Sequence, residues 1–60
     1  MTADWSEGIT DRTGDTLRIA TVERGAFLEL ESTNMVLELG PAEAERLKAI
    51  IDRYLAGATR

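Results

Sequence analysis

The chain has 60 residues, 43% of them hydrophobic, a net charge of −4, and neither cysteine nor histidine. The missing cysteines exclude disulfides and thiolate metal sites, and the missing histidines remove the commonest general base and transition-metal ligand. This length fits one domain at most, and such a small core leaves a folded chain only marginally stable. Because disulfides are excluded and the residues present give little support for a metal, self-association is the expected source of further stability.

Charge is distributed unevenly along the chain. Residues 1–40 hold eight acidic residues against three basic ones, whereas residues 41–60 hold three against four. An acidic amino-terminal part repels phosphate backbones, which argues against a nucleic-acid-binding sheet. No apolar run approaches the ~18 residues of a membrane span, so the sequence is interpreted as that of a cytoplasmic protein.

The first segment, MTADWSEGITDRTGD, places Trp5 and Ile9 among polar residues. It is interpreted as a lead-in in which residues 4–10 either form an edge strand or stay irregular. The run DRTGD predicts a turn, because Gly14 is free to adopt a positive φ. The two aspartates of this turn resemble a calcium loop only faintly, since the alternating oxygen ligands and the terminal glutamate of an EF-hand are missing.

Two alternating stretches predict a β-hairpin. They are TLRIATV at residues 16–22 and FLELE at residues 27–31, and both alternate with a period of two. The four residues between them include Gly25, which can supply the left-handed position of a hairpin loop.

The register of this hairpin follows from its side chains. Pairing Val22 with Phe27 collects apolar residues on one face and sets Arg18 opposite Glu31 on the other. A slip of one residue would send every side chain to the opposite face, so this register is the expected one.

A third alternating stretch, MVLEL at residues 35–39, predicts a further strand after a short turn. Its register stays open between two alternatives. One opposes Leu30 to Leu37 and brings two glutamates together, whereas the other opposes Leu28 to Leu37 and avoids that clash. The second register is the preferred one.

The period changes to that of a helix after Gly40. Pro41 suits the first helical position, because its missing N–H needs no partner there, and the pattern predicts a helix over residues 41–56 with Gly57 as its cap. With the sheet over residues 16–39, this helix predicts a two-layer α+β unit of three antiparallel strands, or four if an edge strand forms. The residues predicted to face the sheet are Ala44, Leu47, Ile51, Tyr54, Leu55 and Ala58.

Residues suited to catalysis or ligand binding have simpler explanations. Glu29, Glu31 and Glu38 share the predicted outer sheet face, where a solvated surface accounts for them without acid–base chemistry or a bound cation. Arg46 and Arg53 lie on one side of the helix with acidic neighbours, which is typical of a mixed solvated face. The sequence therefore predicts a non-enzyme with no catalytic residue, no metal and no cofactor.

Several apolar side chains find no place in the predicted core. Three alternate to the outer face of the sheet, and the tryptophan belongs to neither layer. Ile50 lies about 90° from the centre of the apolar stripe of the helix, beside Tyr54. In a protein short of core, such residues predict contact with a partner. Alternatively, Trp5 folds over the outer face onto Phe27 and Val36. The predicted interface residues are Val22, Phe27, Val36, Ile50, Tyr54 and Trp5.

The run VLELGPAEAERLKAII resembles a strand-to-helix junction in short proteins of actinobacteria and their phages. There, a V-x-L-x-L stretch, a serine or threonine, a proline and acidic residues follow a small antiparallel sheet. Pro41, Glu43, Ala44 and Leu47 match this pattern, and Gly40 replaces the serine or threonine. The resemblance implies a fold rather than an activity, and it transfers no functional residue.

These features predict a small non-enzymatic protein-interaction module that acts as a homodimer and binds a further protein. One version of this hypothesis is a phage or mobile-element accessory protein that modulates a host factor. The alternative is a nucleic-acid-binding regulator that uses the carboxyl-terminal helix, with an affinity that falls steeply with salt.

Overall fold

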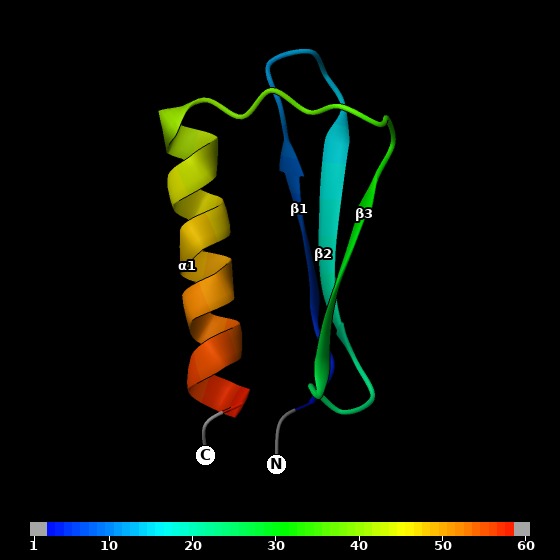
Figure 1. Cartoon of the computed structure of the whole chain (residues 1–60), viewed down its shortest axis with the longest axis vertical. Helices are drawn as coiled ribbons and strands as arrows, with labels where there is room; N and C mark the ends of the chain where they lie inside the picture. Colours follow the sequence, from blue (N-terminus) through cyan, green and yellow to red (C-terminus); the bar gives the residue numbers. More distant parts are fainter. Residues whose placement is uncertain (1–2, 59–60) are drawn as a thin grey trace.

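The computed structural model describes residues 3–58, which contain three strands and one helix (Figure 1). The strands form one antiparallel sheet in the order β1-β2-β3, and α1 packs against it chiefly through β1. This arrangement confirms the predicted α+β fold of three antiparallel strands followed by one helix. The elements are β1 (Ser6–Thr10), β2 (Thr16–Val22), β3 (Phe27–Ser32) and α1 (Pro41–Ala58).

The sheet includes β1 at one edge. The sequence alone does not decide whether this segment forms a strand or stays irregular. Its register pairs Ile9 with Leu17 and Glu7 with Ile19, so Ile9 points to the side of the sheet that becomes buried. The turn that follows is the predicted one, and Gly14 adopts a φ of 93° that a residue with a side chain rarely takes.

The hairpin of β2 and β3 has the predicted register. Val22 pairs with Phe27, and Arg18 pairs with Glu31. The loop between the strands turns through three consecutive left-handed residues, because Glu23 (φ 53°) and Arg24 (φ 59°) join Gly25 (φ 82°) in that conformation. Only the glycine was expected there, since residues with a Cβ lose roughly 1–2 kcal/mol in the left-handed region.

Residues 33–40 cross the end of the sheet as an irregular linker, so the strand predicted at residues 35–39 was wrong and neither of its registers exists. A side chain from another turn holds the linker in place. The backbone N–H of Glu38 donates to Asp11 Oδ2 at 2.9 Å, and the Arg12 side chain pairs with that of Glu38 at 3.4 Å. These contacts fasten the linker to the β1–β2 turn rather than to the edge of β3.

The apolar residues of the linker are divided between core and solvent. Leu37 and Leu39 are half-buried against the core, whereas Met35 and Val36 are 101% and 73% exposed. The alternation in this segment therefore directs two leucines under the end of the sheet without forming a strand.

The helix begins where the sequence indicates. The Gly40 C=O accepts the Ala44 N–H at 2.9 Å, and the Gly40 N–H donates to Glu43 Oε1 at 2.9 Å. The second bond is the glutamate half of a capping box, here made without a serine or threonine at the cap. The helix continues to Ala58, so Gly57 lies inside its last turn and does not cap it as predicted.

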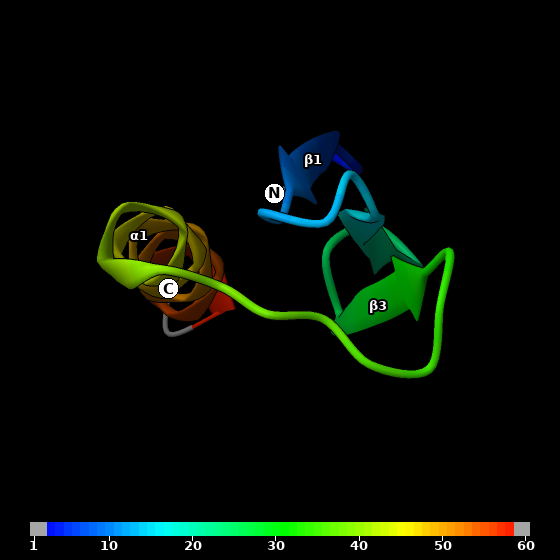
Figure 2. The same cartoon turned by 90° about the horizontal axis from the view of Figure 1, so that it is seen from above.

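The core lies between α1 and the first two strands. Among residues 3–58, four apolar side chains are buried, and partly buried neighbours surround them. Figure 2 shows α1 as a separate layer on one side of the sheet, with the linker running from β3 across to the start of the helix. The buried apolar residues are Ile9, Leu17, Ile19 and Ile50.

The molecule is a thin slab. Its Cα trace spans 36 × 20 × 13 Å and has a radius of gyration of 12.0 Å. A compact chain of this length has a radius of gyration of about 10 Å. The accessible surface is 4396 Å², against about 3900 Å² for a typical folded monomer of this mass. The single chain therefore exposes more surface than its size requires.

Candidate interaction surface

The orientation of α1 differs from the predicted one. Among the described side chains of α1, Ile50 is the one buried apolar residue, with 5% of its surface exposed. Leu47 and Tyr54 are half-buried. Ile51 and Leu55, which were predicted to face the sheet, are 36% and 50% exposed. The helix is therefore turned about its axis, so that the stripe of Leu47, Ile50 and Tyr54 faces the sheet instead of a stripe centred near Ile51.

Two arginines hold one flank of the helix against β1 in this orientation. An Arg46 Nη donates to the Gly8 C=O at 3.3 Å, and Arg53 forms an ion pair with Glu7. Both contacts draw one flank of the helix onto β1. Because successive residues turn by about 100°, the apolar residues that directly follow the buried stripe lie on the opposite flank, on the side of β3.

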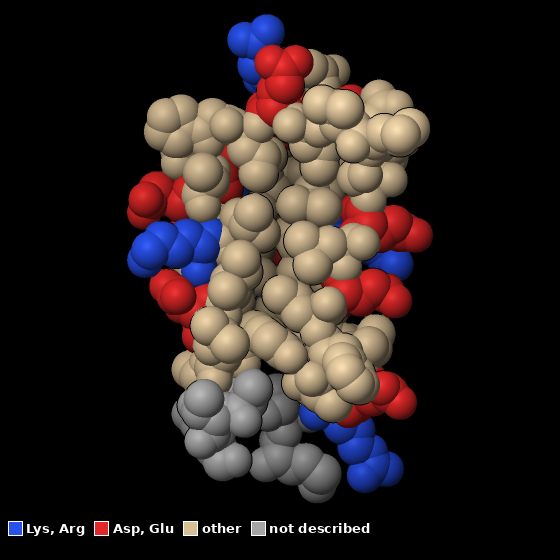
Figure 3. Space-filling model, viewed as in Figure 1, with Lys and Arg blue, Asp and Glu red and all other residues tan. Residues whose placement is uncertain are grey.

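β3 exposes apolar side chains to that same side. Leu28 pairs with Thr21 and Leu30 pairs with Ile19, so both leucines point to the helix side of the sheet. Leu30 is nevertheless 53% exposed, because α1 lies over β1 and leaves β3 uncovered. Figure 3 shows uncharged side chains along the middle of this side of the molecule, between two charged flanks. We call this surface the open face, and it consists of Leu28, Leu30, Ile51 and Leu55.

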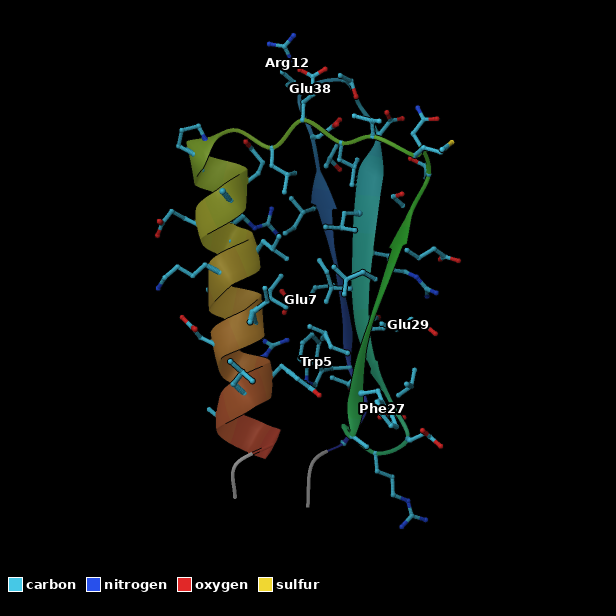
Figure 4. The ribbon with its side chains drawn as sticks, in the orientation of Figure 1. Trp5, Glu7, Arg12, Phe27, Glu29 and Glu38 are labelled. Atoms are coloured by element: carbon cyan, nitrogen blue, oxygen red, sulfur yellow. The ribbon has the colours of Figure 1, made fainter. Side chains whose placement is uncertain are left out.

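Trp5 joins β1 to the end of the helix. Its side chain packs against the core, its C=O accepts the Thr21 N–H at 2.9 Å, and its N–H donates to Thr21 Oγ1 at 3.0 Å. The Arg53 guanidinium carbon lies 3.9 Å from the indole centroid, a cation–π contact. Figure 4 shows Trp5 and Glu7 between the helix and the strands. The alternative in which Trp5 folds over the outer face of the sheet was therefore wrong.

A shallow pocket of about 280 Å³ lies where α1 meets β1. This volume is just below the range of ~300–1,000 Å³ that is typical of small-molecule sites. Both guanidinium groups at the pocket already bind partners on β1. The pocket therefore offers no unpaired positive charge to a ligand. It is lined by Glu7, Arg46, Ala49, Ile50 and Arg53.

The predicted cluster on the outer face of the sheet forms only in part. Val22 and Phe27 are cross-strand neighbours, and Phe27 is 59% exposed. Val36 lies in the linker, at the end of the molecule opposite to the labelled Phe27 in Figure 4. A role of these residues in an interface stays a prediction, but Val36 does not belong to the same patch as the other two.

Ile50 was assigned to an interface, with Tyr54 beside it, because it lay at the margin of the predicted apolar stripe, and that placement of Ile50 was wrong. Ile50 belongs to the core of the single chain, and the Tyr54 hydroxyl donates to the Ala26 C=O at 3.0 Å. Their exposed neighbours Ile51 and Leu55 were missed. The pair Ile50 and Ile51 could have indicated an exposed isoleucine. Two residues about 100° apart on a helix cannot both point at the middle of one sheet.

Asp11 is the most strongly perturbed titratable group in the described chain. Its Oδ1 accepts the Thr13 hydroxyl at 2.6 Å and the backbone N–H groups of Thr13 and Asp15 at 2.9 Å each. The hydroxyl bond first, and then the Glu38 N–H on Oδ2, lower the pKa of Asp11 from 3.8 to about 2, although partial desolvation opposes them. The ionised carboxylate holds the turn and the linker together, which is a structural role.

The acidic side chains that were predicted to share the outer sheet face are separated in the structure. Across residues 3–58, no group of three or more acidic side chains lies close enough together to hold a metal ion. Glu29 and Glu31 stay on the outer face of the sheet, where Arg18 pairs with Glu31 at 3.1 Å. Glu38, which was predicted to share that face, lies in the linker instead.

Similarity to known proteins gives no guide to the function. No protein-family model matches the chain, and no curated protein or solved structure shows significant similarity to it. In the part of the chain that the structure describes, no helix is both long and apolar enough to cross a bilayer. The open face is therefore the feature from which a function can be argued.

Proposed function

We propose that the protein is a non-enzymatic protein-interaction module that acts as a homodimer, with the open faces of two copies packed against each other. The observation that carries this proposal is the exposure of Leu30 (53%), Leu55 (50%) and Ile51 (36%) on one side of a small core. Contact between two such faces removes apolar surface from water, at about 25 cal/mol for each Å².

The open face lies on the side seen in Figure 1, whose outline measures 36 × 20 Å. A standard protein–protein interface takes ~800 Å² from each partner, so a dimer on this side uses the polar surface around the open face as well. A twofold contact uses the same patch on both copies, so one open face is sufficient to build it.

The arrangement of charge around the open face supports the same proposal. Lys48 and Asp52 form an ion pair at 3.3 Å on the exposed flank of the helix. Figure 3 shows charged side chains on both sides of an uncharged middle. An apolar centre with a polar rim is the usual composition of a protein interface.

The contacts of the helix arginines favour this proposal over nucleic-acid binding. Arg46 binds the Gly8 C=O and Arg53 binds Glu7 and Trp5, so phosphate contacts would compete with bonds inside the chain. The proposal places the dimer in the cytosol, a compartment that a sequence without cysteine suits.

Sedimentation equilibrium at micromolar concentration tests the dimer. The wild-type chain should give twice the 6.6 kDa of one copy, and Leu55→Glu and Leu30→Glu should each give a monomer, because either change buries a charge at the contact. Phe27→Glu is the matched control, since Phe27 is similarly exposed at 59% but lies on the opposite face of the sheet. A wild-type monomer, or a dimer that only Phe27→Glu dissociates, would contradict the proposal.

A further inference from the structure

The direction of the backbone hydrogen bonds shows which groups of β3 remain available. Thr33 N donates to Thr16 O at 3.2 Å, and residues of an antiparallel strand alternate in the direction of their N–H and C=O groups. The residues of β3 with odd numbers therefore bond to β2, and those with even numbers, among them Leu28 and Leu30, point their N–H and C=O groups away from the sheet. Within the described chain, no hydrogen bond reaches these outward groups.

The other edge of the sheet is covered. By the same alternation, Gly8 on β1 points its C=O outward, and Arg46 of the helix donates to that oxygen at 3.3 Å. Arg53 and Glu7 form an ion pair along the same edge. Proteins commonly protect edge strands with such charged side chains. β3 thus differs from β1, because its outward backbone groups lie open beside an apolar surface.

The side chains at the β3 edge define what an added strand would meet. On the helix side, Leu28 and Leu30 lie across from the exposed flank of α1 that carries Ile51 and Leu55. On the opposite side of β3 lie Glu29 and Glu31. Since side chains alternate along a strand, the added strand would direct one set at an apolar surface and the other set alongside two carboxylates.

A second copy of this chain is a poor match for that edge. The two antiparallel registers that overlap nearly all of β3 place Glu29 opposite either Glu29 or Glu31 of the other copy, and like charges directly opposite each other are destabilising. Glu31 already pairs with Arg18, whereas Glu29 forms no ion pair among the described residues. The uncompensated carboxylate favours a partner strand with positive charge, as does the net charge of −4.

We propose that the free edge of β3 binds an extended segment of another protein in which apolar and basic residues alternate. The segment adds a fourth strand to the sheet, its backbone bonds to the outward groups of Leu28 and Leu30, and its basic side chains pair with Glu29 and Glu31. This is recognition by strand addition, in which backbone bonds give affinity and alternate side chains give specificity. The inference rests on the proposed function in one respect, since the apolar side chains of the segment occupy the open face and compete with the second copy.

The probe for this site is a fluorescent, strand-length peptide of alternating valine and lysine, titrated with the full chain. It should bind the wild-type protein and shift the protein toward monomer in sedimentation. Two control peptides separate the contributions: valine alternating with glutamate reverses the charge, and methylation of alternate backbone amides in the lysine peptide removes its hydrogen bonds to the edge. Both control peptides should bind at least about tenfold more weakly.

Charge reversal on the protein locates the site. Glu29→Lys should weaken binding of the lysine peptide by about tenfold and strengthen binding of the glutamate peptide. Glu45→Lys makes the same change in net charge at an exposed helix position, and it should alter binding by less than about threefold.

Equal binding of the methylated and unmethylated peptides would refute the inference without use of any variant. So would equal losses in Glu29→Lys and Glu45→Lys, which would indicate non-specific attraction to an acidic protein. If wild-type chains form a dimer but bind no lysine peptide, strand addition fails and the proposed dimer stands. If the chains are monomers that bind the peptide, the dimer fails and the strand site stands.

Discussion

Individual polar side chains join elements of this slab that lie far apart in the sequence. Asp11 accepts the Glu38 N–H, Arg46 donates to the Gly8 C=O, and the Tyr54 hydroxyl donates to the Ala26 C=O. In a chain whose described core has four buried apolar side chains, such bonds decide where the linker and the helix lie. Asp11 is the clearest case, because one carboxylate binds both the turn that follows β1 and the linker that precedes α1.

The pH dependence of stability should report the contribution of Asp11. Its carboxyl has a pKa of about 2 in the fold against an ordinary 3.8. A lowered pKa stabilises the fold above about pH 4, and the contribution is lost as the pH falls from about 4 toward 2. Asp11→Asn keeps one acceptor oxygen but cannot accept the Glu38 N–H on the other side. We expect a lower urea midpoint at neutral pH and a smaller loss of stability on acidification, measured through Trp5 fluorescence.

Glu45→Gln serves as the matched control for this titration, because it removes an exposed helix carboxylate that forms no ion pair in the described chain. It should leave both the midpoint and the pH profile near those of the wild type. Parallel acid profiles for Asp11→Asn and the wild-type chain would show that this carboxylate does not anchor the linker.

At the scale of elements, the sequence predicts structure that depends on residues close together in the chain, such as a hairpin. The β2–β3 register is correct because alternation and the Arg18–Glu31 pair agree on one pairing. The linker at residues 35–39 has equal alternation, but alternation says only which side a residue faces and not whether a strand lies beside it. The bond from Glu38 to Asp11 spans 27 positions, so no local pattern reveals it.

The orientation of the helix and the open face were missed for a related reason. The apolar residues of α1 cover a wide arc, so the helix could pack on the sheet through either side of that arc. Hydrophobic periodicity does not distinguish these two orientations. Arg46 and Arg53 contact β1 in the observed orientation, and their partners Gly8 and Glu7 lie 38 and 46 positions away, where no local pattern reveals them. Periodicity therefore predicts the helix and its surplus of apolar residues, but the interface assignment on the helix was Ile50 with Tyr54 and not the exposed Ile51 and Leu55.

Alanine substitution at the two adjacent isoleucines tests this orientation. Ile50 is 5% exposed and Ile51 is 36% exposed. Ile50→Ala should cost about 2–5 kcal/mol of unfolding free energy, as expected for a core residue. Ile51→Ala should cost less than Ile50→Ala, because a side chain that is 36% exposed loses less buried apolar surface on truncation. Both changes are compared by urea unfolding in the Leu55→Glu background, so that loss of self-association does not enter the measurement.

Sucrose in all samples keeps the Leu55→Glu reference chain folded, since excluded osmolytes strengthen burial. A core of this size supplies at most ~3–5 kcal/mol, so the urea transition of Ile50→Ala, followed by circular dichroism, should lie close to zero urea. Equal costs at the two positions, or a larger cost at Ile51, would place the helix in the orientation predicted from its periodicity.

At the scale of the whole molecule, the thin shape limits stability, because a thin molecule has few buried side chains. A slab 13 Å deep has one layer of buried side chains, and its radius of gyration of 12.0 Å exceeds the roughly 10 Å of a compact chain. A domain of about 60 residues hides only ~60% of the surface of its unfolded chain, which leaves little free energy to hold it folded. Pairing two open faces doubles the thickness of the structure and buries its most exposed core-side leucines.

The melting temperature should therefore depend on protein concentration. A partner that binds only the folded chain stabilises it by mass action. At a total chain concentration about a hundred times the dissociation constant, roughly one folded chain in fifteen stays monomeric, so dimerisation contributes about 1.6 kcal/mol. For a domain of this size, each kcal/mol raises the melting temperature by about 4–8 °C. We expect the wild-type and Phe27→Glu chains to melt at higher temperature as concentration rises, and Leu55→Glu to melt at a constant lower temperature. A wild-type melting temperature that stays constant from low to high micromolar concentration would mean that the slab is stable alone and that the open face is not buried between two copies.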